Sequence, residues 1–231
     1  MNIEKFKVFF QIAPIRTILF NLKYFPLKEA FRFPVFLAHG VSIVHCYKGF
    51  CEFEGGVRTG MLKFGFLGRD SNPNVKCRIM IRGKVIVQGC GFHSFGVGTI
   101  LIVGEKGVLT LGNNFSAAGL DKIVCKCAIT VGDDNMWSWG NVIMDSDIHQ
   151  ICNDNNQVIN YNKEIVFGNH VWLGCNNIVL KGAIIPDGCI IASGSKISGK
   201  FTEKNTIITS QGKVIKTNVF WKRDGALNID K

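Results

Sequence analysis

The sequence predicts an all-β fold in which short strands wind into a stacked coil, and two observations lead to this prediction. The first is the composition, because 26 glycines stand against 5 prolines in 231 residues and 47% of the residues are hydrophobic. Valine- and isoleucine-rich runs such as 79–89 and 100–114 follow one another without a helical interval. Such runs favour short strands joined by tight turns.

The second observation is an internal repeat of six residues that starts at Phe167 and reads FGNHVW, LGCNNI, VLKGAI, IPDGCI, IASGSK, ISGKFT. The first position always holds a bulky apolar residue, and the fifth is mostly small. The first-position residues are Phe167, Leu173, Val179, Ile185, Ile191 and Ile197. Such a unit is typical of one flat side of a triangular coil, and three units make a coil of about 18 residues.

The same register occurs upstream, with Val131, Trp137 and Ile143 in first position, but it fails between Ile148 and Glu164. This asparagine-rich stretch predicts a loop over 149–163 that leaves the coil, and loops on rigid scaffolds often bind ligands or catalyse reactions. We therefore expect an N-terminal cap over 1–40, a coil domain over 41–205 and a C-terminal extension over 206–231.

Residues 1–36 combine phenylalanine-rich stretches with six basic residues and two acidic ones. Two interpretations stay open: a helix that covers the open end of the β domain, or a segment that lies on an anionic bilayer. The chain lacks both a stretch of about 18 apolar residues and a signal peptide pattern. We expect a cytoplasmic protein, at most peripheral at the inner face of the membrane.

The formal charge of +10 favours anionic partners, but no nucleic-acid-binding motif is recognisable. Cys125 and Cys127 form a C-x-C pair without a second pair at zinc-finger spacing. We expect neither a nucleic-acid partner nor a bound metal.

The sequence resembles the hexapeptide-repeat acyltransferases, and among them the O-acetyltransferases of sugars and capsular polysaccharides. The matching pieces are "VGDD" at Val131, "IMDSDIH" from Ile143, the loop, "FGNHVWLG" from Phe167 and the following "IPDGCIIASGS". They cover about half of the chain, in the family's order. The resemblance implies a left-handed parallel β-helix and a homotrimer with active sites between subunits. It also implies that acetyl-CoA donates an acetyl group to a hydroxyl of a cell-surface glycan unit, free or lipid-linked.

His149 is the predicted catalytic base, because acyl transfer to a hydroxyl needs a base whose pKa lies near neutrality. Asp147 and Asp145 stand two and four residues before it and can reach the same side of an extended chain. Either carboxylate could orient the imidazole. His170 is at the fourth position of its unit, which points outward, so a surface role is expected for it.

The resemblance also implies binding residues. The predicted acceptor contacts are Trp172 and Trp139, although Trp172 could instead pack at a subunit contact. The predicted neighbours of the pantetheine arm are Gly174, Cys175, Ser193 and Ser198. Lys213 is expected near the CoA phosphates, or else as a solvated surface lysine.

The sequence leaves three alternatives to an O-acetyltransferase open. An amino-sugar N-acetyltransferase would use the same fold. A non-catalytic scaffold or binding module is suggested by Ala118, because similar enzymes often carry an acceptor-contacting asparagine at this position. A zinc carbonic anhydrase would need three converging histidines, and only His149 and His170 lie in the relevant region.

Overall fold

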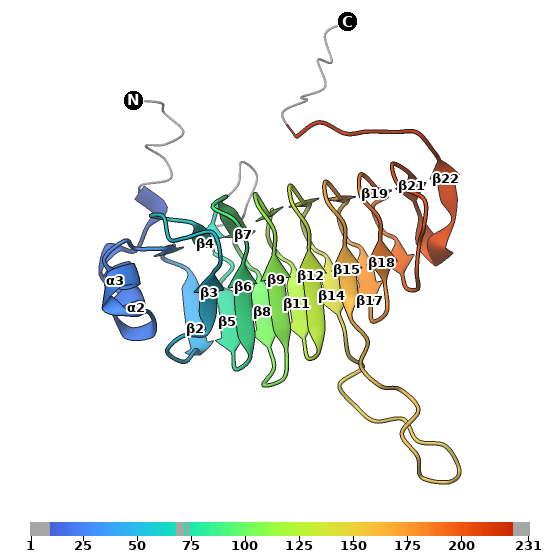
Figure 1. Ribbon diagram of the computed structural model, residues 1–231, viewed down its shortest axis with the longest axis horizontal. Coiled ribbons are helices and arrows are strands. Elements are labelled where there is room, and N and C mark those ends of the chain that lie inside the picture. The colour runs from blue at the N-terminus through green and yellow to red at the C-terminus, as the bar shows by residue number, and fades with distance from the viewer. Residues whose placement is uncertain (1–9, 68–71, 73, 224–231) are drawn as a thin grey trace, which may run out of the picture.

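Three parallel sheets form the sides of a long prism in the computed structural model, which describes residues 10–67, 72 and 74–223 (Figure 1). The nine-stranded sheet contains, in spatial order, β1 (Val35–Leu37), β4 (Leu62–Phe66), β7 (His93–Gly96), β10 (Ser116–Ala117), β13 (Met136–Trp137), β16 (Trp172–Leu173), β19 (Ile190–Ile191), β21 (Ile207–Ile208) and β22 (Val214–Lys216). The seven-stranded sheet contains β2 (Val41–His45), β5 (Cys77–Ile81), β8 (Ile100–Val103), β11 (Lys122–Cys125), β14 (Val142–Met144), β17 (Ile178–Leu180) and β20 (Lys196–Ile197). The six-stranded sheet contains β3 (Cys51–Phe53), β6 (Lys84–Val87), β9 (Val108–Leu111), β12 (Ala128–Val131), β15 (Ile165–Phe167) and β18 (Ile184–Ile185).

Neighbours within a sheet are usually three strands apart in the sequence, because the chain visits each sheet once per turn of the coil. The strands pair in parallel, except that β22 runs antiparallel to β21 at the C-terminal end. This is the three-sided parallel coil that the repeat predicts, and it agrees with the parallel β-helix that the family resemblance implies.

Burial confirms the predicted register of the repeat. The nine first-position side chains from Val131 to Ile197 are at most 1% exposed. Fifth-position residues share the interior, since Val171, Ala183 and Cys189 are fully buried. The sixfold pattern therefore identifies the residues that fill the prism.

Short elements cover the two ends of the coil. Helices α2 (Pro14–Tyr24) and α3 (Leu27–Ala30) lie over the N-terminal end (Figure 1). The 3-10 helix η1 (Ser210–Gly212) precedes β22, after which the chain runs back along the coil. Of the helices in the described part of the chain, none is long and apolar enough to cross a membrane.

A ladder of buried side chains joins successive corners between the nine-stranded and seven-stranded sheets. The N–H of Asn141 donates to the Asp121 carboxylate (2.9 Å), that of Asn177 to the Asn141 side chain (3.0 Å), and that of Ser195 to the Asn177 side chain (2.7 Å). The side-chain amides of Asn141 and Asn177 also donate to the carbonyls three residues earlier. Asp121 is the exception in this ladder, because its carboxyl group cannot donate when ionised.

Replacing Asp121 with asparagine is expected to stabilise the protein above neutral pH. Burial raises the pKa of Asp121 to about 7 from 3.8, so the folded state favours the protonated form. The stability that the raised pKa of Asp121 adds to the folded state is fully present below pH 3.8 and is lost as the pH rises through 7. In urea unfolding at pH 8, Asp121→Asn should gain about 1–3 kcal/mol, and the gain should vanish near pH 4. Asp154→Asn, in the exposed loop, should show no such pH-dependent gain.

Candidate active site

The loop between β14 and β15 begins at Asp145, whose buried carboxylate is anchored to the preceding turn of the coil. Its two oxygens accept hydrogen bonds from the backbone N–H groups of Lys126 (2.6 Å) and Cys127 (2.7 Å). Burial raises the pKa of Asp145, while these amides favour the ionised form. This carboxylate therefore fixes the point at which the chain leaves the coil.

Asp147 links the outgoing and the returning segments of the loop. Its Oδ2 accepts hydrogen bonds from Lys181 Nζ and from Asn160 Nδ2, the latter at 2.8 Å. The same Asn160 amide also donates to the backbone carbonyl of His149 (2.8 Å). The hydrogen bond from Lys181 is the main reason why the pKa of Asp147 lies below its usual value.

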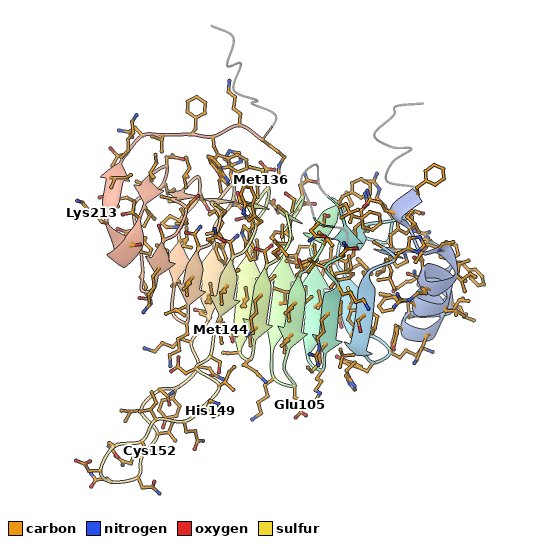
Figure 2. The ribbon with its side chains drawn as sticks, turned by 180° about the vertical axis from the view of Figure 1, so that it is seen from behind. Glu105, Met136, Met144, His149, Cys152 and Lys213 are labelled. Atoms are coloured by element: carbon orange, nitrogen blue, oxygen red, sulfur yellow. The ribbon has the colours of Figure 1, made fainter. Side chains whose placement is uncertain are left out.

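His149 lies where the loop leaves the coil, and its side chain is exposed (Figure 2). Its backbone N–H donates to the carbonyl of Asp147 (2.7 Å), and Ile148 between them adopts a left-handed conformation with φ 68°. This tight turn directs the chain outward at His149. The carboxylates of Asp145 and Asp147 are held by the partners given above, and within the described residues neither bonds to the imidazole.

His149 borders a cavity of about 540 Å³ between the loop and the seven-stranded side of the coil. Three cationic side chains, Arg82, Lys106 and Lys126, line this cavity, against the acids Glu105 and Asp147. Asp147 is already paired with Lys181. The cavity therefore offers a positive environment next to an exposed imidazole, which suits an anionic ligand.

Most of the predicted binding residues lie at another edge of the prism, between the nine-stranded and seven-stranded sheets. Trp139, Cys175 and Ser193 occupy successive corners there: Asn176 N–H bonds to the Trp139 carbonyl (3.0 Å), and Cys175 N–H to Ser193 Oγ (3.2 Å). Gly174 lies so close to Ser193 that a Cβ at this position would meet Ser193 Oγ at 2.8 Å. Gly174, Cys175, Ser193 and Trp139 thus form one continuous edge.

The remaining predicted binding residues are more scattered. Trp172 is half-buried on β16 and donates from Nε1 to Ser138 Oγ (3.3 Å), one corner from Trp139. Ser198 is exposed at the edge that follows β20. Lys213 is exposed between η1 and β22, at the C-terminal end of the coil (Figure 2). In the described part of the chain, none of these predicted binding residues lines the cavity beside His149.

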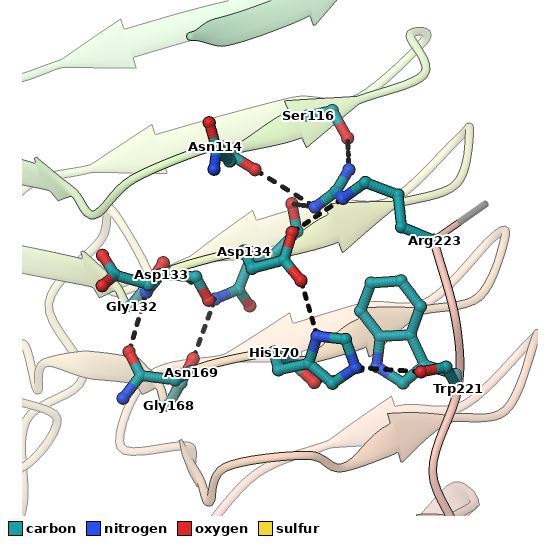
Figure 3. Close-up of polar contacts among 11 residues, drawn as sticks. Asn114, Ser116, Gly132, Asp133, Asp134, Gly168, Asn169, His170, Trp221 and Arg223 are labelled. Carbon is teal, nitrogen blue, oxygen red and sulfur yellow. Dashed lines mark hydrogen bonds and ion pairs between the residues drawn. The ribbon is translucent and has the colours of Figure 1, made fainter. Parts of the chain in front are cut away.

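The C-terminal tail contributes a polar network that sequence reasoning missed (Figure 3). The His170 ring stacks on Trp221 with centroids 4.1 Å apart, and its Nδ1 lies 2.6 Å from Asp134 Oδ2. Arg223 donates to the other oxygen of Asp134 (2.7 Å) and to Ser116 Oγ (2.7 Å). The sequence signal for this docking is the aromatic and basic "FWKR" segment from Phe220 in the C-terminal extension.

Arg223 also borders a second cavity, of about 510 Å³, on the nine-stranded side. Lys63, Phe92 and Ala118 line the same cavity. Ala118 stands where similar enzymes often have asparagine, so this wall of the coil lacks the amide that the family resemblance leads one to expect. It lies on a different side of the prism from the His149 loop.

Comparison with known proteins finds similar sequences among acetyltransferases, although no family model matches the chain. It is 40% identical to the polysialic acid O-acetyltransferase of Neisseria meningitidis over 74 residues, which are 32% of each chain. It is 29% identical to the polysialic acid O-acetyltransferase of Escherichia coli O1:K1 over 127 residues, covering 54% of this chain and 39% of that one. The chain thus spans about a third of the length of these two relatives.

A longer match is to WbbJ of Escherichia coli K12, a protein named as a lipopolysaccharide biosynthesis O-acetyl transferase. The identity is 27% over 178 residues, which cover 73% of this chain and 89% of WbbJ. These relatives by sequence are O-acetyltransferases named for polysialic acid and lipopolysaccharide. Their similarity agrees with the family resemblance that the six-residue repeat and the motifs indicate.

Proposed function

We propose that the chain transfers an acetyl group from acetyl-CoA to a hydroxyl of an anionic sugar unit during synthesis of a cell-surface glycan. The observation that carries this proposal is the exposed imidazole of His149 beside the cavity lined by Arg82, Lys106 and Lys126. The cations suit an acceptor that bears carboxylate or phosphate. The names of the relatives agree with such an acceptor, since polysialic acid is a polymer of carboxylated sugars.

In the proposed reaction, His149 removes the proton of the acceptor hydroxyl as its oxygen attacks the thioester carbonyl. The C–S bond then breaks, and the proton on the imidazole passes to the departing thiolate. Backbone N–H groups would stabilise the oxyanion. Asp145 and Asp147 support the histidine indirectly, because their bonds to the coil and to Lys181 fix the loop that presents it.

The donor is proposed to lie along the edge formed by Gly174, Cys175 and Ser193, with Trp139 and Trp172 near the acyl group and acceptor. Ser198 and Lys213 would flank the far end of the donor, where the cation is suited to the CoA phosphates. Both are exposed, which leaves them accessible to a ligand.

We further propose that three chains associate, so that the His149 edge of one subunit faces the Gly174 edge of the next. Two observations support a shared site. The two groups lie on different edges of a single prism, and the outer side of the seven-stranded sheet between them is largely apolar. Ile178 is 42% exposed there, and Ile102 and Met144 are partly exposed. We also propose that the protein works at the inner face of the membrane, which the exposed apolar side chains of the N-terminal helices support.

Acetyl-CoA-dependent activity should be measured as release of free thiol. With oligomers of sialic acid as acceptor, thiol release should exceed that with a neutral glucose oligomer by at least about tenfold. Acetyl-CoA alone should raise the melting temperature, because a ligand of the folded state stabilises it. If acetyl-CoA neither raised the melting temperature nor released thiol with any acceptor, a non-catalytic scaffold would be the better interpretation.

A further inference from the structure

Helix α2 turns two uncharged polar side chains toward the protein. Thr17 and Asn21 are buried together with Phe20. The Asn21 side chain accepts a hydrogen bond from Val35 N–H (3.1 Å) and donates to the Val35 carbonyl (2.8 Å), and Thr17 Oγ1 accepts from Leu37 N–H (3.1 Å). These bonds satisfy the edge of β1, the first strand of the nine-stranded sheet, which would otherwise be open.

The opposite side of α2 is consequently apolar and faces outward. Ile15, Ile18, Leu19 and Leu22 recur at helical spacing on this side, and α3 with its C-terminal neighbour adds Leu27 and Phe31. We call these six residues the end patch. The exposed fractions of Ile15, Leu19, Leu27 and Phe31 are 72%, 61%, 64% and 68%. A cluster of large apolar side chains in water marks an interaction surface.

The segments that carry the end patch are rich in positive charge. Residues 10–50 contain one acidic residue, Glu29, and five basic residues: Arg16, Lys23, Lys28, Arg32 and Lys48. Two of the cations are held in place by the fold. Arg16 donates to the carbonyls of His39 and Val41, and Arg32 donates to the carbonyl of Val57. An apolar helix face flanked by cations matches the surface of an anionic bilayer.

We propose that the end patch docks this protein on an anionic lipid bilayer, with the aliphatic side chains in the interface and the cations against lipid headgroups. A second copy of the chain fits less well, because a self-complementary contact would place these cations against one another. The patch lies at the N-terminal end of the coil, whereas the loop with His149 leaves its side further along (Figures 1 and 2). Docking would therefore leave the loop open to a glycan chain. The proposal deepens the membrane location that is part of the proposed function, and it is argued from residues outside the catalytic site.

Co-sedimentation of the full chain with lipid vesicles tests this docking. The protein should bind vesicles of phosphatidylcholine mixed with phosphatidylglycerol, and bind vesicles of phosphatidylcholine alone far more weakly. In Leu19→Glu/Phe31→Glu, binding to the anionic vesicles should fall by at least about tenfold. Both side chains are exposed, so circular dichroism and the melting temperature should stay unchanged.

The matched control is Ile215→Glu/Phe220→Glu, which places the same two charges on side chains that are 55% and 74% exposed near the other end of the coil. This control should lose less than about twofold in vesicle binding. Equal losses in both variants would overturn the proposal, since net charge alone would then explain the binding. A smaller oligomer in the end-patch variant only, with vesicle binding unchanged, would assign the patch to a second copy. Thiol release with a soluble acceptor should be the same in all three proteins, which separates this test from that of the catalytic proposal.

Discussion

His149→Ala is expected to lower acceptor-dependent thiol release by about 10²–10⁴-fold, the contribution typical of a positioned general base. Its imidazole is exposed at the cavity and makes no side-chain hydrogen bond within the described residues, so removing it should not disturb the fold. The loss should appear in kcat, because proton removal occurs in the transition state. Initial rates at saturating acetyl-CoA and varied acceptor measure it directly.

His45→Ala provides a control, because His45 is also exposed but belongs to β2, at the other end of the coil. It should retain the full rate. Acetyl-CoA should still raise the melting temperature of His149→Ala, since this variant removes the base and leaves the edge at Gly174 intact. An unchanged rate in His149→Ala would remove the histidine from the mechanism.

The coil could be predicted in detail because the same packing requirement recurs every six residues. A bulky first-position side chain must face the interior at each side of the prism, so Trp137 and Phe167 could be assigned to the core directly. The contact between Asp145 and Lys126 spans 19 residues, about one turn of the coil. Spacing alone could therefore have placed these two residues side by side.

The contacts that the sequence did not predict lie in segments without a repeat. In α2, Thr17 and Asn21 pack inward because the edge of β1 needs hydrogen bonds. The pattern of hydrophobic residues in the sequence does not reveal this requirement. The stacking of His170 on Trp221 joins residues 51 apart through an irregular tail. Similarly, Lys181 reaches Asp147 across the whole loop, 34 residues away in the sequence. Contacts of this kind follow from the path of one loop or tail and leave no period to detect.

A column of aromatic rings runs through the interior of the coil and makes Trp137 central to stability. Phe64, Phe95, Phe115, Trp137 and Phe167 follow one another with centroid separations of 5.1, 5.2, 4.8 and 4.8 Å. Trp137 is 1% exposed and contacts a ring on either side. Its indole Nε1 is buried and has no hydrogen-bond partner among the described residues. The contribution of Trp137 to stability therefore comes from packing, reduced by the cost of one unpaired donor.

Trp137→Ala should lower the free energy of unfolding by about 3–5 kcal/mol, because it leaves a cavity between two turns of the coil that rigid neighbours cannot fill. Trp137→Phe should lose much less, since it keeps a ring in the column and removes the unpaired N–H. Trp139→Ala, two residues away but 54% exposed, should stay within about 0.5 kcal/mol of the wild type. Guanidinium unfolding followed by far-UV circular dichroism would measure all three. Equal losses for alanine at 137 and 139 would mean that the ring column does not stabilise the coil, because only Trp137 belongs to it.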